Sequence, residues 1–126
     1  MIEVIKKLKS FGTKVSIFIN PEIEYVEGAF DCGADRIELY TGDYSSDYLQ
    51  DKNNSIKKYL NASLKGKELN MDVNAGHDLN LDNLKYFKSK ISFLFEVSIG
   101  HALISDSIYY GIENTIKKYL AELNYE

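Results

Sequence analysis

Two short histidine-bearing segments are the clearest chemical signal in the sequence. The chain has two histidines, and each directly follows a glycine, in Gly76-His77 and Gly100-His101. Both pairs come at the end of a predicted strand, and they lie one β/α unit apart. An imidazole exchanges protons near neutral pH, and a glycine lets a backbone amide approach an anion. One such turn alone is more simply a surface loop, but two in register favour a site for a phosphate or another anion.

A carboxylate lies on a third predicted strand. Glu38 is on the polar side of that strand, shortly before the Thr41-Gly42 turn. A carboxylate there can act as a base, an acid or an electrostatic stabiliser, although a salt bridge to a lysine is the commoner use. Asp72, Asn74 and Glu96 are interpreted as polar packing deeper along their strands. A zinc site is the weaker alternative, because the histidines lack metal-ligand spacing, and no metal site is predicted.

Helices and strands alternate along the whole chain and must position these residues. Strands are predicted over residues 14–20, 36–41, 69–75 and 93–99. A helix over residues 1–11 precedes the first strand, and a helix follows every strand. Strict alternation favours parallel strands joined by right-handed crossovers.

The helix ends and buried faces can also be predicted. Asn20 is expected to cap a helix with Pro21 in its first turn, and Asn80 to cap the helix after the third strand. The helix over 44–66 is expected to break near residues 53–55. The expected buried residues of the helix after Pro21 are Ile23, Val26 and Phe30. A single final helix is expected to bury Ile108, Ile112, Ile116, Tyr119, Leu120 and Leu123.

The strand patterns favour a barrel over an open sheet. Ile37 and Leu39 share one face of their strand, whereas Glu38 and Tyr40 share the other. Parallel strands covered by helices on both faces are apolar throughout, so a polar face indicates the interior of a (β/α) TIM-type barrel. A full barrel needs about 250 residues. The prediction for residues 1–126 is therefore the C-terminal half of one barrel domain: four β/α units preceded by a helix.

Composition excludes several other classes of protein. The net charge is −4, with 15 basic and 19 acidic residues and no long basic run, which disfavours nucleic-acid binding. No stretch is long and apolar enough to cross a membrane, and lysines interrupt the N-terminal segment where a signal peptide needs an apolar core. Cys32 is the single cysteine and cannot form an internal disulfide. The cytoplasm is the expected compartment.

Four segments, in order and at compatible spacing, resemble the pyridoxine 5′-phosphate synthase family. The segments are Val15–Asn20, Gly33–Gly42, Val73–Leu79 and Glu96–Leu103. The resemblance runs over nearly the whole chain but covers only the second half of the family's sequence. It implies a homo-oligomeric (β/α)₈ barrel without a metal or organic cofactor. The implied transferase-class reaction condenses 3-amino-1-hydroxyacetone 1-phosphate with 1-deoxy-D-xylulose 5-phosphate, giving pyridoxine 5′-phosphate, phosphate and water.

The resemblance also implies roles for individual residues. His77 corresponds to the family's proton donor and Glu38 to its transition-state stabiliser. Gly100 and His101 correspond to residues that bind the amino-ketone phosphate. Asp78 stands where some members have a glycine that contributes a backbone contact to the same substrate.

The family's first half brings further catalytic residues that this sequence does not contain. They include an Asn-x-Asp-His strand and a second catalytic glutamate. We therefore expect a fragment that is inactive alone, and either a homo-oligomer or a missing N-terminal half as its partner. The alternative is a non-catalytic half-barrel module that binds a phosphate ligand or dimerises.

Overall fold

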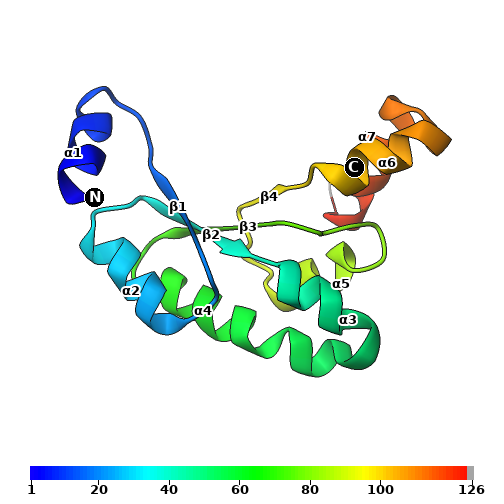
Figure 1. Cartoon of the computed structure of the whole chain (residues 1–126), viewed down its shortest axis with the longest axis horizontal. Helices are drawn as coiled ribbons and strands as arrows, with labels where there is room; N and C mark the ends of the chain where they lie inside the picture. Colours follow the sequence, from blue (N-terminus) through cyan, green and yellow to red (C-terminus); the bar gives the residue numbers. More distant parts are fainter. Residues whose placement is uncertain (125–126) are drawn as a thin grey trace.

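The computed structural model describes residues 1–124, in which helices and strands alternate as the sequence predicts (Figure 1). The four strands are β1 (Ser16–Ile19), β2 (Arg36–Tyr40), β3 (Asp72–Gly76) and β4 (Glu96–Ser98). The helices are α1 (Ile2–Ser10), α2 (Ile23–Asp31), α3 (Gly42–Ser55), α4 (Lys57–Glu68), α5 (Leu84–Lys90), α6 (His101–Tyr110) and α7 (Ile112–Glu122).

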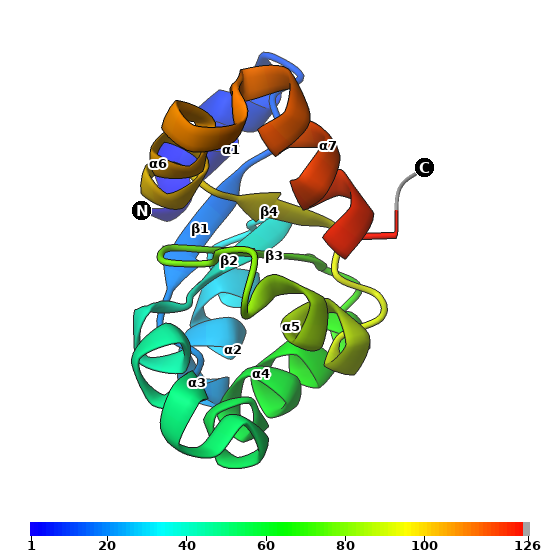
Figure 2. The ribbon, with the colours of Figure 1, turned by 90° about the vertical axis from the view of Figure 1, so that its right-hand side faces the viewer.

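The four strands form one parallel sheet in the order β1-β2-β3-β4. Each strand pairs with the next one in the sequence, so every connection is a crossover that carries helix, as a parallel sheet requires. Figure 2 shows α2, α3, α4 and α5 together on one side of the sheet. An all-parallel sheet with helices packed on one face and polar residues on the other is consistent with half a (β/α)₈ barrel, which confirms the predicted fold class.

The core lies between the sheet and these outer helices. Ile37, Leu39 and Val73 point toward the helices and are fully or almost fully buried. Helix α4 packs closely on this face at Gly66, where an added Cβ would lie 3.0 Å from Cδ1 of Ile37 and 3.1 Å from Cγ2 of Val73. The predicted apolar face of β2 is therefore correct, and its other face, with Glu38, is left for the inner side.

Buried aromatic rings join α3, α4 and α5 beneath the sheet. The rings of Tyr44, Tyr59 and Phe87 meet edge to face, with centroids 4.9 to 5.8 Å apart. The Tyr44 hydroxyl donates a hydrogen bond of 2.7 Å to the backbone oxygen of Asn83. Burial raises the pKa of the Tyr44 and Tyr59 hydroxyls far above the usual value, so both stay neutral, and the Tyr59 hydroxyl accepts from the amide of Tyr44 at 3.1 Å. This cluster holds the start of α5, and α5 directly follows the loop after β3.

The single final helix predicted from the sequence is wrong, because the segment forms two helices. Gly111 has φ = 75°, a left-handed conformation that favours glycine, and it separates α6 from α7. Helix α7 folds back on α6, and the Tyr119 hydroxyl donates to Oδ2 of Asp106 at 2.8 Å. Tyr119 is buried as predicted. The other apolar residues expected on one helix face are divided between α6 and α7, and Ile108 is 79% exposed. Ile112, Ile116 and Leu120 are also exposed.

The predicted start of the second helix is also wrong. Helix α2 begins at Ile23, and the backbone oxygen of Asn20 accepts a hydrogen bond from the amide of Glu22, so a short turn precedes the helix. Asn20 does not cap it. Val26 is fully buried as predicted, but Ile23 and Phe30 are each 46% exposed because the sheet side of α2 is centred on Val26 and Ala29.

Two later boundaries differ for local reasons. The third strand begins at Asp72 rather than Leu69, because Leu69 ends α4 and Asn70 adopts φ = 57°. Helix α5 begins at Leu84, since the Oδ1 atom of Asn80 accepts from the amides of two residues in a preceding turn. The helical break expected at residues 53–55 occurs as a kink at Asp51 and a helix end at Ser55.

Candidate phosphate-ligand site

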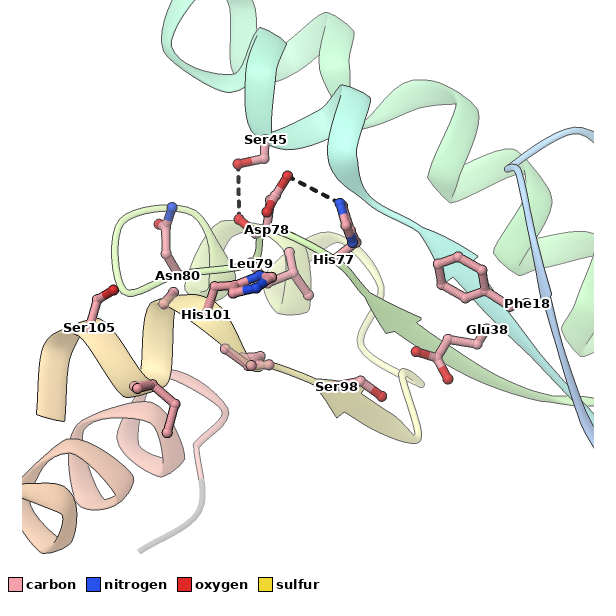
Figure 3. Close-up of a pocket in the computed structure, with 14 residues that line it drawn as sticks. Phe18, Glu38, Ser45, His77, Asp78, Leu79, Asn80, Ser98, His101 and Ser105 are labelled. Carbon is pink, nitrogen blue, oxygen red and sulfur yellow. Dashed lines mark hydrogen bonds and ion pairs between the residues drawn. The ribbon is translucent and has the colours of Figure 1, made fainter.

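All five residues singled out in the sequence line one hollow on the inner side of the sheet. The hollow has a volume of about 1180 Å³ and lies at the carboxyl ends of the strands (Figure 3). Its lining includes Glu38, His77, Asp78, Gly100 and His101. The structure therefore brings together side chains from three β/α units, at the end of the sheet where (β/α)₈ proteins hold their ligands.

The carboxylate of Glu38 occupies space that a missing side chain leaves open. Glu38 and Gly76 belong to the neighbouring strands β2 and β3. A Cβ placed on Gly76 would lie 2.5 Å from Oε1 of Glu38 and 3.0 Å from Cβ of Ser98. Because Gly76 has no side chain, the carboxylate can extend over the backbone of β3 toward the hollow. In Figure 3 the Glu38 carboxylate points from β2 toward the side of Ser98.

His77 lies in a strained turn directly after β3. Its φ is 91° and that of Asp78 is 57°, values that non-glycine residues rarely adopt. The imidazole packs on the ring of Tyr40, with centroids 4.8 Å apart, and Nε2 lies 3.5 Å from Oδ2 of Asp78. The His77 side chain is 46% exposed, so it is held on one side and open to a ligand on the other.

Three polar residues hold this turn, and the sequence did not reveal their role. Thr41 donates its backbone amide to the carbonyl oxygen of Gly76, and its hydroxyl lies within hydrogen-bond distance of the carbonyl oxygens of both Gly76 and His77. Ser45 donates its hydroxyl to the carbonyl oxygen of Asp78 at 2.9 Å. Asn83 donates to the same oxygen at 3.3 Å. Residue type and spacing do not mark the contacts of Thr41 and Ser45 in advance, since both depend on two β/α units being adjacent. The contact of Asn83 lies within a single loop.

The second histidine lies at the start of helix α6. Gly100 precedes the helix, its carbonyl oxygen accepts from the amide of Ile104, and His101 is the first helical residue. The first amides of a helix have no partner within the helix and carry partial positive charge, so this end favours an anion. Space is open around Gly100, where an added Cβ would meet no atom within 4 Å. Ser105, one turn later, also lines the hollow.

The single arginine lies at the other end of the sheet. Arg36 begins β2, and its guanidinium pairs with Asp72 at 3.3 Å and Glu96 at 3.5 Å. It also lies 4.5 Å above the ring of Phe95. The two histidines are the only basic side chains that line the hollow within residues 1–124. Asp72 and Glu96 thus form an ion-pair network, while Asn74 is buried with Oδ1 unpaired.

Over residues 1–124, no three His, Cys, Asp or Glu side chains are grouped so that they could hold a metal ion. Over the same range, no helix is long and apolar enough to cross a membrane.

The fold and the hollow indicate the class of protein. A parallel β/α sheet of half-barrel size, with polar residues gathered at the carboxyl ends of its strands, is the arrangement of (β/α)₈ proteins that hold small molecules. The family described as pyridoxal phosphate biosynthesis protein PdxJ matches residues 1–125, and the chain belongs to this family.

Curated relatives agree with this family. The chain is 51% identical over 123 residues to a pyridoxine 5′-phosphate synthase of Cytophaga hutchinsonii, covering 98% of this chain and 52% of that protein. It is 47% identical over 118 residues to the protein of the same name from Christiangramia forsetii, covering 94% and 50%. The Porphyromonas gingivalis protein is 42% identical over 123 residues, covering 98% and 52%. The chain thus spans about half the length of these relatives.

Proposed function

We propose that this chain provides the amino-ketone phosphate side of a pyridoxine 5′-phosphate synthase active site. The observation that carries the proposal is the meeting of Glu38, His77 and His101 around one hollow, on three different β/α units. The curated relatives that share this half of the sequence are named as synthases. In the proposed reaction, 3-amino-1-hydroxyacetone 1-phosphate and 1-deoxy-D-xylulose 5-phosphate condense to pyridoxine 5′-phosphate, phosphate and water.

Each residue has a role that its surroundings support. His77 is the proton donor, since its ring is fixed against Tyr40 and open toward the hollow. Glu38 stabilises positive charge that develops on the substrate, because a carboxylate in a partly enclosed site acts strongly on such charge. Gly100 and His101 hold the substrate phosphate at the start of α6, where free amides and an imidazole converge.

Asp78 replaces a glycine found in some members of the family. Its carboxylate lies toward Nε2 of His77, as Figure 3 shows, and its carbonyl oxygen is held by Ser45. We propose that Asp78 serves the substrate through its backbone amide and that its carboxylate orients His77. A negative side chain beside a phosphate would otherwise weaken binding by direct repulsion.

The partner that completes the site is part of the proposal. Strands β1 and β4 each have one edge without a partner strand in the described structure, and open edges of a parallel sheet invite pairing. We propose that four further β/α units close the barrel, supplied by an N-terminal half or by a homo-oligomer. The second substrate's phosphate would bind on those units, because Arg36 is engaged at the far end of the sheet. The cytoplasm is the proposed compartment.

Phosphate titration followed by histidine NMR tests the binding half of the proposal. The chain has two histidines, so both imidazole signals can be resolved and followed separately. Both should move with inorganic phosphate, and with the amino-ketone phosphate at lower concentration. His101→Gln should weaken binding about tenfold, which corresponds to loss of one charge-assisted hydrogen bond. Binding that leaves both histidine signals unmoved would contradict the assignment.

Turnover tests the catalytic half. The purified chain alone should form no pyridoxine 5′-phosphate, whereas a mixture with the N-terminal half of a relative should form it. Glu38→Gln and His77→Gln should abolish the restored turnover, and Thr115→Val, a change in α7 away from the hollow, should not. A normal rate from the chain alone would refute the need for a second half.

A further inference from the structure

One buried threonine lies at the junction between β2 and the histidine turn. Thr41 follows β2 directly and is fully buried. Its hydroxyl lies 2.7 Å from the carbonyl oxygen of Gly76 and within hydrogen-bond distance of the carbonyl oxygen of His77. Its backbone amide also donates to the Gly76 oxygen at 2.9 Å. Two successive carbonyl groups at the end of β3 therefore converge on a single residue of the neighbouring unit.

The turn that these contacts hold is one that the chain would not adopt freely. His77 and Asp78 both have positive φ, and neither is a glycine. A non-glycine residue in such a conformation is strained, and the conformation persists only where its surroundings enforce it. Thr41 holds the carbonyl of His77 itself, so it acts at the strained residue. Ser45 holds the next carbonyl, that of Asp78, from the surface.

We propose that Thr41 is a positioning residue for His77, fixing the orientation in which the imidazole faces the hollow. The inference rests on the proposed function for its consequence in catalysis, but its structural part stands independently. Thr41 does not line the hollow and acts through the backbone of His77. The ring of Tyr40 packs against the His77 imidazole at a centroid distance of 4.8 Å, and Phe18 meets Tyr40 edge-on at 5.9 Å.

Substitution by valine removes the hydroxyl contacts of Thr41 and keeps the contact of its backbone amide. Valine keeps the shape of threonine and the backbone amide, so the Gly76 oxygen retains a donor and the pairing of β2 with β3 persists. The carbonyl of His77 loses its hydroxyl partner. The expected effect is local to His77, whereas His101, on another unit, serves as an internal reference in the same spectrum.

The test compares Thr41→Val with Thr41→Ser, Thr41→Ala and Thr115→Val. Thr115 is also fully buried and its hydroxyl also donates to a backbone oxygen, that of Gly111 at 3.0 Å, so it is a matched control. Two quantities are measured at fixed pH: the imidazole chemical shifts, and the dissociation constant for inorganic phosphate. The alanine variant cannot overpack the site and serves if the valine variant fails to fold.

In Thr41→Val the His77 signal should move toward the position of a free histidine, because its ring leaves the shielding of Tyr40, while the His101 signal stays in place. Phosphate affinity should fall roughly threefold to tenfold, since the turn of His77 and Asp78 spends less time in the conformation that binds the ligand. Thr41→Ser should restore both values, and Thr115→Val should change neither. An unmoved His77 signal in both Thr41→Val and Thr41→Ala overturns the inference, as does an equal shift in Thr115→Val. Absence of phosphate binding by the wild-type chain would instead count against the proposed function, and the His77 shift would still decide the role of Thr41.

Discussion

Replacing Gly76 by alanine tests the packing that directs Glu38 into the hollow. A Cβ at this position would lie 2.5 Å from Oε1 of Glu38, 3.0 Å from Cβ of Ser98 and 3.2 Å from the Ser98 carbonyl oxygen. The φ of Gly76 is not positive, so the backbone itself accepts alanine and the effect must come from these contacts. The Glu38 carboxylate has to leave its place over Gly76, and the backbone of β4 also has to shift.

The magnitude follows from two opposing terms. Overpacking of this kind costs about 1–3 kcal/mol, and the lost flexibility of the unfolded chain returns about 0.4–1 kcal/mol. We therefore expect Gly76→Ala to lower the free energy of unfolding by about 1–2 kcal/mol. With a urea slope of about 1–3 kcal/mol per molar, the unfolding midpoint should fall by roughly 1 M.

Urea unfolding followed by circular dichroism provides the assay, with Gly28→Ala as the matched control. Gly28 lies in α2 with no atom within 4 Å of an added Cβ, so alanine should stabilise the helix there by up to about 1 kcal/mol. Adding Glu38→Ala to Gly76→Ala should recover part of the loss, giving a coupling of about 1 kcal/mol. A Gly76→Ala variant as stable as the wild type, or strictly additive with Glu38→Ala, would refute this account of the site.

Three further predictions concern the loop and the two pH limits of stability. Asn83→Ala should lower the free energy of unfolding by about 2 kcal/mol and speed amide exchange around Asp78, because the buried Asn83 side chain accepts from the amide of Asn80 and donates to the Asp78 carbonyl. A hydrogen bond from Lys9, and then one from a backbone amide, lower the pKa of Asp35 below its ordinary 3.8. The stabilisation is therefore present above pH 3.8 and is lost as the pH falls below it, so Asp35→Asn should flatten the acid limb of the stability curve. Burial raises the pKa of Tyr44 above 10.0, so the free energy of unfolding should fall as the pH rises beyond 10.0, and Tyr44→Phe should flatten this alkaline limb. An alkaline limb as steep in Tyr44→Phe as in the wild type would contradict this.

The order of elements and the location of the site could be predicted because both depend on patterns along the chain. Alternation of helix and strand fixes a parallel sheet, and a parallel sheet places all strand ends on one edge. His77 and His101 could therefore be assigned to one rim without coordinates, and they do line a common hollow. The two faces of β2 could be separated because side chains alternate along a strand.

Other features depend on contacts between distant residues and could not be predicted. Gly111 offers a helix stop, but the apolar stripe around it favours a continuous helix, and only packing of Tyr119 against α6 shows that the chain folds back. Thr41 and Asn83 look like ordinary turn residues in sequence. The hydrogen bonds of Thr41 to the histidine loop exist only because β2 and β3 are adjacent, and Asn83 reaches Asp78 only in the folded form of its own loop.

The position of Arg36 separates the residues that stabilise the sheet from the residues that line the hollow. Its ion pairs with Asp72 and Glu96 tie three strands together at their amino ends, away from the hollow. Substitutions among the residues that line the hollow can then change ligand preference while leaving these ion pairs intact. We expect natural variants of the chain to differ in loop chemistry more freely than in these three charges, and laboratory selection for a new phosphate ester could begin from the rim without first restoring stability.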